Sequence, residues 1–274
     1  MLFVQKLKWL KTLQTQPYVN TGTWQGQDVS EKPELDAKEL YNQIYTTRIP
    51  KTVEDMVIKY EPNLPWADKH YAERIGGLPL NPPPSEAEWP FAVKGNEDSK
   101  KGKIFSHTYP ERFWPAFANS HPNFGLSGVL KFGIRFAYGD FQDVINHLIN
   151  NPGSRQAYLP IWFPEDTGVV HGERVPCTLG YHFLVRNNEV NVTYFIRSCD
   201  LLRHFNDDVY MAARLALTVS EALNCHWKDE FFYPGTLTMH IVNLHVFRAD
   251  EYQVEEQIKD LTDRERALWA EIQW

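Results

Sequence analysis

One cysteine of this sequence stands in a setting that suits nucleophilic chemistry. In VPCTLGYHF (175–183), Cys177 follows a proline and precedes an alternating, strand-like run. The RSCD segment (197–200) closes the next strand-like run, so a hairpin would bring Arg197 beside the cysteine. A nearby cation lowers the pKa of a thiol and favours the nucleophilic thiolate. Free cysteine is also among the most buried residue types, so a small core residue is the competing interpretation of Cys177.

The elements that would position these residues are clearest after position 140. From Phe141, apolar residues recur at helical spacing; Asp140 is suited to cap this helix, and Pro152 with Gly153 ends it. The sequence also predicts a strand within 156–163, a hairpin over 178–199 with its turn at Asn187 and Asn188, a buried helix at 209–223, a strand at 236–247 and a surface helix at 250–272. Together these elements predict an α+β fold in which a mostly antiparallel sheet packs against helices.

The N-terminal half has weaker patterns. Residues 1 to about 125 indicate irregular structure, with an ordered proline-rich connection at 76–90 and an exposed charged loop at 93–103. The first 13 residues are basic and amphipathic, which favours a helix docked on the protein over one on a membrane surface. We expect a single domain over 1–274, with a divergent part at 1–125, a catalytic core at 126–250 and a C-terminal helix at 251–274.

Composition and charge argue against several classes of function. The 274 residues are 43% hydrophobic and 23% charged, as in ordinary globular proteins. A net charge of −7 argues against a nucleic-acid partner, which needs a basic surface, and no uncharged apolar run is long enough to cross a bilayer. Three cysteines without a signal peptide favour a reducing compartment, the cytoplasm, or the host cytoplasm if the source is viral. We expect no metal ion.

Three segments in a fixed order resemble the thymidylate synthase superfamily. NNPGSRQAYLPIWFPED (150–166) resembles its phosphate loop, and VPCTLGYHFLVRNNEVNVTYFIRSCDLL (175–202) resembles its nucleophile strand and RSxD motif. TMHIVNLHVF (238–247) resembles the strand whose histidine meets the sugar. The resemblance covers residues 140–250. It implies a sheet-mediated homodimer, a pyrimidine nucleoside monophosphate as substrate and 5,10-methylenetetrahydrofolate as co-substrate.

The resemblance also implies roles for the nucleophile and the phosphate ligands. Cys177 is the thiolate that adds to carbon 6 of the pyrimidine, which makes carbon 5 nucleophilic. Arg197 and Ser198 bind the nucleotide phosphate, and Arg155 reaches the same phosphate from the neighbouring subunit. The family's second arginine in that loop is Gln156 here, so one phosphate contact is lost.

Three further residues match positions around the folate, the reacting atoms and the sugar. Asp200 would orient the pterin of the folate, or else be a helix-capping or loop aspartate. Glu73 precedes the proline-rich bend and would order water and move protons, or else be an ordinary helix-surface glutamate. His245 would meet the 3′-hydroxyl, but the tyrosine expected two residues later is Phe247, so a ribonucleotide such as CMP remains an alternative substrate.

The position that selects the base lies eleven residues beyond Arg197. Thymidylate synthases carry an asparagine there, which binds the uracil edge; an ungapped count in this chain reaches Asp208. An ionised carboxylate accepts from the amino group of cytosine and has nothing to donate to the uracil oxygen, so Asp208 favours cytosine. The deoxycytidylate hydroxymethylases, closest in pattern, share this substitution and Thr178 after the cysteine. An offset of two residues would bring Asn206 to this position and restore a preference for uracil.

The expected activity is the conversion of dCMP to 5-hydroxymethyl-dCMP. Hydride delivery would give 5-methyl-dCMP instead; the sequence ends in EIQW without the usual synthase tail, which favours hydroxymethylation. A methyltransferase, an enzyme acting on CMP, a thymidylate synthase acting on dUMP and a nucleotide-binding regulatory protein without turnover remain alternatives. A Cys177→Ala variant separates the regulatory protein from the enzymes, because it abolishes turnover in an enzyme and leaves nucleotide binding intact.

Overall fold

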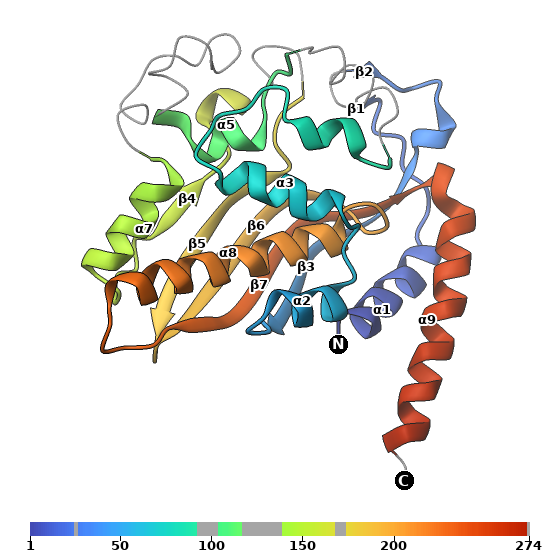
Figure 1. Cartoon of the computed structure of the whole chain (residues 1–274). Coiled ribbons are helices and arrows are strands. Elements are labelled where there is room, and N and C mark those ends of the chain that lie inside the picture. Colours follow the sequence, from blue (N-terminus) through green and yellow to red (C-terminus); the bar gives the residue numbers. More distant parts are fainter. Residues whose placement is uncertain (25–26, 92–103, 117–138, 168–173, 273–274) are drawn as a thin grey trace.

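A five-stranded mixed sheet is the centre of the fold (Figure 1). The computed structural model describes residues 1–24, 27–91, 104–116, 139–167 and 174–272. Its strands are β3 (Ala37–Arg48), β4 (Tyr158–Pro160), β5 (Thr178–Arg186), β6 (Glu189–Asp200) and β7 (Tyr233–Phe247), and a small separate sheet joins β1 (Thr23–Trp24) to β2 (Gln27–Asp28). The order is β3-β7-β6-β5-β4, and each neighbouring pair is antiparallel except the parallel pair of β6 and β7. The predicted α+β fold with a mostly antiparallel sheet is confirmed.

The β5–β6 hairpin forms where the sequence predicts it. Along β6, buried residues alternate with half-buried ones, so one face of the strand points into the core. The turn residues Asn187 and Asn188 have φ values of 51° and 59°, a conformation that asparagine adopts more readily than most residues. The backbone N–H of Arg197 donates to the carbonyl oxygen of Cys177 at 2.9 Å. The hairpin therefore places the RSCD segment directly opposite the cysteine.

The long helix α8 (Phe205–His226) covers β6 and β7 on one face of the sheet (Figure 1). It begins at Phe205, earlier than the predicted 209, because its first turn is satisfied by a distant segment. The fully buried carboxylate of Asp207 accepts hydrogen bonds from the backbone N and Nδ2 of Asn63, at 2.7 and 2.8 Å. The polar residues 206–208 thus belong to the start of the helix.

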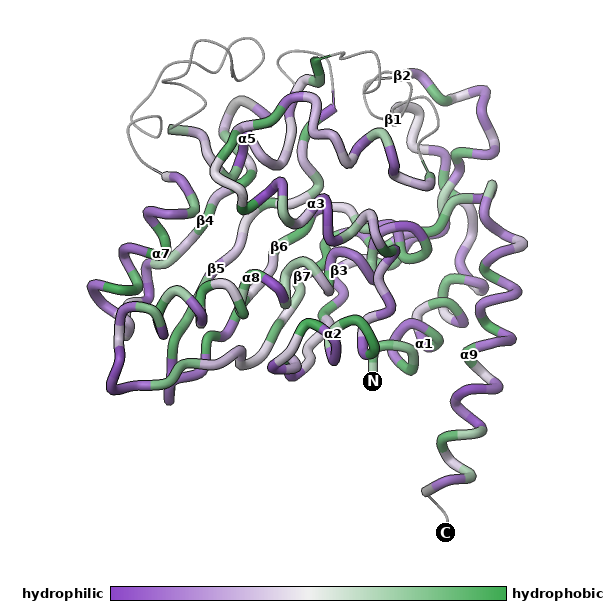
Figure 2. Tube along the Cα trace, viewed as in Figure 1, coloured by the Kyte–Doolittle hydropathy of each residue, from purple (hydrophilic) through white to green (hydrophobic). Residues whose placement is uncertain are grey.

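The remaining helices surround this core. They are α1 (Leu2–Gln14), α2 (Val53–Tyr60), α3 (Trp66–Ile75), α5 (Tyr109–Phe113), α7 (Phe141–Asn150) and α9 (Glu251–Ile272), with a 3-10 helix η2 at Pro84–Glu88. The predicted helices α7 and α9 are both present. α9 is largely polar (Figure 2), buries Val254 and Leu261, and packs against α1. In the part of the chain that the structure describes, no helix is long and apolar enough to cross a membrane.

The prediction of irregular structure over residues 1–125 is wrong for much of the part that the structure describes. This part contains α1, which buries Leu7, Leu10 and Leu13 and docks on the protein as expected, and the 12-residue strand β3. β3 is an edge strand of the five-stranded sheet, with β7 as its neighbouring strand, and it exposes polar and apolar residues alike, so its alternation is weak in the sequence. The charged segment 93–103 lies outside the described residues.

Candidate active site

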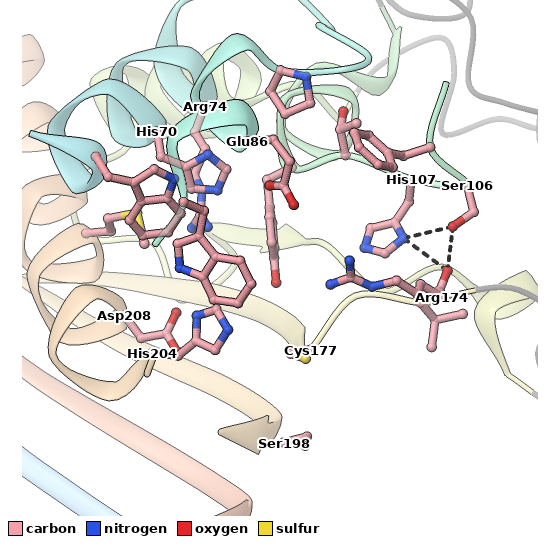
Figure 3. A pocket seen from close by; sticks show the side chains of 18 residues that line it. His70, Arg74, Glu86, Ser106, His107, Arg174, Cys177, Ser198, His204 and Asp208 are labelled. Atoms are coloured by element: carbon pink, nitrogen blue, oxygen red, sulfur yellow. Dashed lines mark hydrogen bonds between the residues drawn. The ribbon is translucent and has the colours of Figure 1, made fainter. Parts of the chain in front are cut away.

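A cavity opens beside Cys177, between α3, α8 and the segments that precede α5 and β5 (Figure 3). Among the residues predicted to form a site, Cys177, Ser198 and Asp208 line this cavity. They come from three elements: the start of β5, the end of β6 and the first turn of α8. The fold therefore brings the thiol and the carboxylate of Asp208 to one cavity, although 31 positions separate them in the sequence.

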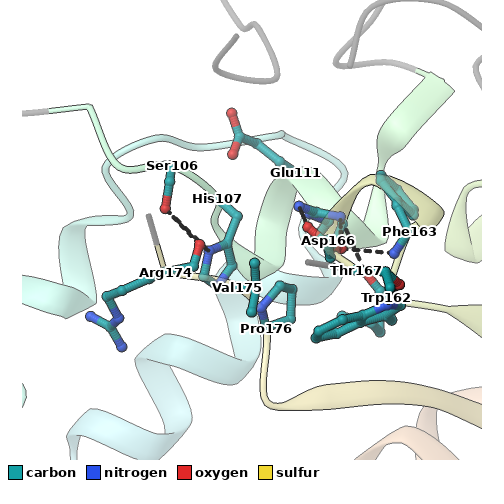
Figure 4. A network of polar contacts seen from close by, with 12 residues as sticks. Ser106, His107, Glu111, Trp162, Phe163, Asp166, Thr167, Arg174, Val175 and Pro176 are labelled. Atoms are coloured by element: carbon teal, nitrogen blue, oxygen red, sulfur yellow. Dashed lines mark hydrogen bonds and ion pairs between the residues drawn. The ribbon is translucent and has the colours of Figure 1, made fainter. Parts of the chain in front are cut away.

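The segment 174–176 that presents Cys177 is fixed from two sides. On one side Ser106 Oγ donates to the carbonyl oxygen of Arg174 at 2.9 Å (Figure 4). On the other, Arg197 donates from Nε and Nη2 to the two carbonyl oxygens directly before Cys177, at 2.8 and 3.1 Å. These contacts hold the half-buried thiol at the wall of the cavity.

The charges around the thiol oppose the effect of its burial. Burial raises the pKa of the Cys177 thiol, whereas Arg197 and Arg174 lower it. Arg197 therefore has two effects here, because it fixes the loop and also favours the thiolate. Arg174 is exposed and lines the cavity, so its charge reaches the thiol from the open side.

A buried ion pair fixes a second part of the network around the cavity (Figure 4). Arg112 of α5 binds the carboxylate of Asp166 with both terminal nitrogens, at 2.8 and 3.0 Å, and both side chains are essentially inaccessible. The backbone N–H of Phe163 donates to the same carboxylate at 2.8 Å. The pair ties α5 to the loop after β4 and so limits movement of the chain near the cavity.

Two of the three polar residues that begin α8 point away from the cavity. Asn206 accepts from Lys6 Nζ and donates to the carbonyl oxygen of Glu61, both at 3.2 Å. Asp207 is bound to Asn63, as described above. Neither Asn206 nor Asp207 lines the cavity, so the ungapped alignment that selects Asp208 agrees with the geometry.

Asp208 has neutral hydrogen-bonding partners. Tyr194 Oη donates to its Oδ1 at 3.3 Å, and Cys199 Sγ lies 3.8 Å from its Oδ2. Burial raises the pKa of Asp208 to about 7, and the guanidinium of Arg74 is the strongest influence in the opposite direction. A carboxyl group with this pKa exchanges its proton near neutral pH, which suits a role in substrate binding or proton transfer.

The two glutamates near the proline-rich bend are in different environments. The carboxylate of Glu73 accepts from the backbone N–H of Ser85 at 2.7 Å and from its hydroxyl, and it lies 3.7 Å from His70 Nδ1. Burial alone would raise the pKa of Glu73, but these contacts lower it overall. Glu73 does not line the cavity, whereas Glu86 of η2 does, and burial raises the pKa of Glu86.

Stacked ring pairs form one wall of the cavity. His70 stacks on Trp66 with ring centres 4.9 Å apart, and His204 stacks on Trp89 at 4.5 Å. Burial lowers the pKa of His70 to about 4 and that of His204 to about 3, so both imidazoles are neutral at physiological pH. The wall offers flat apolar surfaces together with neutral hydrogen-bonding atoms. Within the described ranges, no group of three or more histidine, cysteine or acidic residues is arranged to hold a metal ion.

Besides Glu73 and Arg197, three predicted site residues lie outside the cavity lining. Arg155 is exposed after α7; its predicted target lies in a neighbouring subunit, so its role stays a prediction. Asp200 is buried and accepts from the backbone N–H groups of Leu202 and Arg203, at 2.9 and 3.0 Å, which matches the alternative of a loop aspartate. His245 pairs with Asp200 across the parallel strands and contacts Asn243 at 3.2 Å.

Several lining residues were not recognised in the sequence. Arg174 stands three positions before Cys177 and His204 four before Asp208, so both follow from the motifs once the loop and the helix start are known. Arg74 and Glu86 come from the N-terminal half. Their signal is weaker: two charged residues beside a proline-rich bend that also carries Trp89.

The fold and the cavity together define an α+β domain that presents a cysteine thiol to a pocket of charged and aromatic side chains. Comparison with known proteins gives the family. The sequence model described as thymidylate synthase matches residues 112–272. The chain belongs to the thymidylate synthase family.

Curated relatives agree with this assignment. The chain is 30% identical over 117 residues to a protein of Methanococcoides burtonii named "Putative thymidylate synthase", which covers 42% of this chain and 49% of that protein. It is 26% identical over 156 residues to a protein of Sphingopyxis alaskensis named "Thymidylate synthase", which covers 57% of this chain and 46% of that protein. The matched segments thus span about half the length of these curated relatives.

Proposed function

We propose that this protein converts dCMP to 5-hydroxymethyl-dCMP with 5,10-methylenetetrahydrofolate as one-carbon donor. The observation that carries the proposal is the joint presence of Cys177 and Asp208 in one cavity, from which Asn206 is turned away. The thiol fits the covalent chemistry of the thymidylate synthase family. The carboxylate fits the amino edge of cytosine better than the carbonyl edge of uracil.

Cys177 activates the base. Its thiolate adds to carbon 6 of the pyrimidine, and the electron pair displaced from the carbon 5–carbon 6 bond makes carbon 5 nucleophilic. Arg197 and Arg174 favour the thiolate that this step requires. When the thiolate leaves carbon 6 at the end of the reaction, the same two cations stabilise it again.

Asp208 selects the base through its protonation state. The ionised carboxylate accepts from the 4-amino group of cytosine, and it can also hold the proton that N3 gains when the thiolate adds. Uracil presents an oxygen at carbon 4, which an ionised carboxylate cannot satisfy. A buried group left without a partner costs about 1–3 kcal/mol or more, so the site discriminates between the two bases.

Glu86 is the better candidate for ordering water and moving protons in this cavity. It lines the cavity, and burial raises the pKa of its carboxyl group, which favours exchange of a proton nearer to neutral pH. Glu73 is the residue that the sequence suggested for this role. Its carboxylate is engaged by Ser85, so we assign it to holding η2 and with it Glu86.

The aromatic wall suits the folate. 5,10-Methylenetetrahydrofolate supplies the one-carbon unit, and its pterin is a flat ring system that stacks on aromatic side chains. The ring pairs of Trp66 with His70 and of Trp89 with His204 line the cavity and offer such surfaces. Asp200 does not line the cavity, so it would act on the pterin only through the loop that it caps.

The open face of the sheet supports a homodimer. On the face opposite α8, Ile44 is 57% exposed and Val242 is 48% exposed, and Phe195 stacks on His240 beside them. Apolar side chains that are exposed on this face among the described residues favour a second copy of the chain as the cover. A homodimer formed there would give Arg155 access to the partner's phosphate site.

The proposal is tested by incubating the protein with 5,10-methylenetetrahydrofolate and dCMP, CMP or dUMP. Release of the carbon-5 hydrogen reports activation of the base, and product mass reports the group that is added. We expect release with dCMP and a product heavier by a hydroxymethyl substituent. The Cys177→Ala variant should bind dCMP and release no hydrogen. Absence of release with all three nucleotides would refute the proposal and favour a binding protein.

Thymidylate synthesis from dUMP is the second candidate. The printed names of the relatives favour it, since they are called thymidylate synthases. The same assay separates the two functions, because a methyl product from dUMP differs in mass and in base from a hydroxymethyl product from dCMP. A preference for CMP over dCMP would show that Phe247, which lacks a hydroxyl, no longer selects the sugar.

A further inference from the structure

A buried arginine lines the cavity without an acidic partner at ion-pair distance. Arg74 of α3 is 4% exposed, and its guanidinium lies over the ring of Tyr109 at 4.0 Å. Its Nε has no hydrogen-bond partner, and among the described residues no carboxylate lies within 4.0 Å of its nitrogens. An uncompensated buried charge is strongly unfavourable, so we expect the guanidinium of Arg74 to interact with an anion in the cavity.

Asp208 has a carboxyl group that lines the same cavity as Arg74 and carries the opposite charge when ionised. Figure 3 shows Arg74 and His70 on the α3 side of the cavity and Asp208 with His204 on the α8 side. Asp208 has no cation at ion-pair distance among the described residues, and its direct partners are the hydroxyl of Tyr194 and the thiol of Cys199. Arg74 is the charged group that most lowers its pKa, which burial raises to about 7.

The histidines and the acidic residue near Asp208 do not supply a positive charge in place of Arg74. His204 and His70 are neutral because burial lowers the pKa of each. Asp207 carries a like charge that raises the pKa of Asp208 further. Among the described residues, Asp208 also affects the pKa values of Cys177, Cys199, Tyr109, Tyr181 and Tyr194, none of which is cationic. Arg174, another cation of the cavity lining, lowers the pKa values of Cys177 and His204.

We propose that Arg74 and Asp208 form one base-selecting pair, in which the buried guanidinium favours the ionised form of the carboxylate and thereby directs the site to 4-amino pyrimidines. This inference rests on the proposed function and names the residue that controls its base specificity. An ionised carboxylate only accepts hydrogen bonds, so it matches the 4-amino group of cytosine together with the N3–H that forms when the thiolate adds. A protonated carboxyl group donates one and accepts one, as an asparagine amide does, and matches uracil.

The test is the ratio of kcat/KM for dCMP to kcat/KM for dUMP, measured across pH 5.5–9. Both substrates react with the same thiol and carry the same phosphate. The ionisation of these two groups therefore affects both kcat/KM values equally and leaves their ratio unchanged. In the unchanged protein the ratio should rise with pH as Asp208 ionises. In Arg74→Met the rise should move to higher pH, which lowers the ratio at neutral pH about tenfold for each unit of the shift. Arg74→Lys keeps the charge and should restore most of the ratio.

Two control measurements distinguish an effect of Arg74→Met on base selection from an effect on folding. Arg74→Met replaces an uncompensated buried charge by an apolar side chain of similar length, so its thermal unfolding temperature should not fall. Arg214→Met removes an arginine that also lies over a tyrosine ring, Tyr71 at 4.4 Å, but that pairs with Asp68 outside the cavity lining. The ratio in Arg214→Met should match that of the unchanged protein at every pH.

The outcomes are distinct. An unchanged ratio profile in folded Arg74→Met overturns the pair and leaves the proposed function standing. If the unchanged protein turns over neither nucleotide, the proposed function fails. The pair is then judged by the pKa of the Asp208 carboxyl group, followed by NMR in the unchanged protein and in Arg74→Met. A pKa that rises in Arg74→Met supports the pair, and one that stays the same overturns it.

Discussion

Replacing Asp208 by asparagine exchanges one carboxylate oxygen for an amide N–H at the base-binding position. The new donor matches the uracil oxygen and meets the cytosine amino group with a second donor. We expect kcat/KM for dCMP to fall about 100-fold or more and activity on dUMP to appear. Steady-state kinetics with both nucleotides measures this. The matched control is Asn206→Asp, which changes a neighbouring residue that contacts Lys6 outside the cavity lining and should leave the preference for dCMP intact.

The two glutamates are separated by parallel substitutions. Glu86→Gln removes the carboxyl group that lines the cavity and should lower kcat about 10²–10⁴-fold, the usual contribution of a general acid or base. Glu73→Gln keeps a side-chain oxygen for Ser85 and should reduce stability more than kcat. Single-turnover kinetics and thermal unfolding measure the two effects. A larger loss of kcat in Glu73→Gln than in Glu86→Gln would return the catalytic role to Glu73.

The thiol of Cys177 should react slowly at neutral pH, since burial raises its pKa. Below that pKa the thiolate fraction rises with pH, so alkylation of Cys177 by iodoacetamide should speed up about tenfold per pH unit between pH 7 and 8.5. Arg174→Gln removes an exposed cation that lowers the pKa and should slow the reaction at each pH. Mass spectrometry of each cysteine follows this, with exposed Cys225 as reference. Faster alkylation in Arg174→Gln would contradict the assigned effect of that charge.

Elements with a regular apolar pattern could be predicted, and elements stabilised by distant partners could not. The β5–β6 hairpin follows from alternation on both sides of Asn187 and Asn188. The first turn of α8 was missed because buried Asp207 is polar and is satisfied only by Asn63, 144 positions away. β3 was missed because its exposed positions include apolar residues such as Tyr41 and Ile44, which hide the alternation expected of a half-buried strand.

The candidate site divides in the same way. Cys177, Arg197 and Asp208 follow from local motifs and spacing, because the hairpin and the helix that carry them are contiguous in the sequence. Arg74 and Glu86 face Asp208 and Cys177 only after α3 and η2 have folded over the cavity. The sequence alone does not show whether Glu73 or Glu86 lines the cavity. In the structure Ser85 binds Glu73, and Glu86 is the glutamate that lines the cavity.

The loop between β4 and β5 depends on the ion pair of Arg112 and Asp166. Asp166→Asn leaves the buried guanidinium without its counter-ion and should destabilise the protein by about 3–5 kcal/mol. Urea unfolding measures this loss. Glu189→Gln disrupts the more exposed pair with Arg48 and should cost no more than about 1 kcal/mol. Equal losses in the two variants would mean that burial does not set the strength of the Arg112 pair.

The whole molecule is proposed to be active as a homodimer joined through the open face of its sheet. Val242→Glu places a charge on that face, where Val242 is 48% exposed in the single chain. We expect this variant to be monomeric in analytical ultracentrifugation, because burying an unpaired carboxylate at an interface is unfavourable. It should remain folded, since the side chain is exposed in the monomer. A dimer that persists in Val242→Glu would show that the subunits associate elsewhere.

The contribution of Arg155 across subunits can be tested by mixing two inactive variants. Cys177→Ala lacks the nucleophile, and Arg155→Ala lacks the cation predicted to bind the phosphate in the neighbouring subunit. If the two residues of one site come from different chains, a hybrid dimer contains one site with both changes and one with neither. Random reassociation makes half of the dimers hybrids, so about a quarter of the unmodified activity should return. If both residues of a site belong to one chain, every site in the mixture lacks one of them and no activity returns.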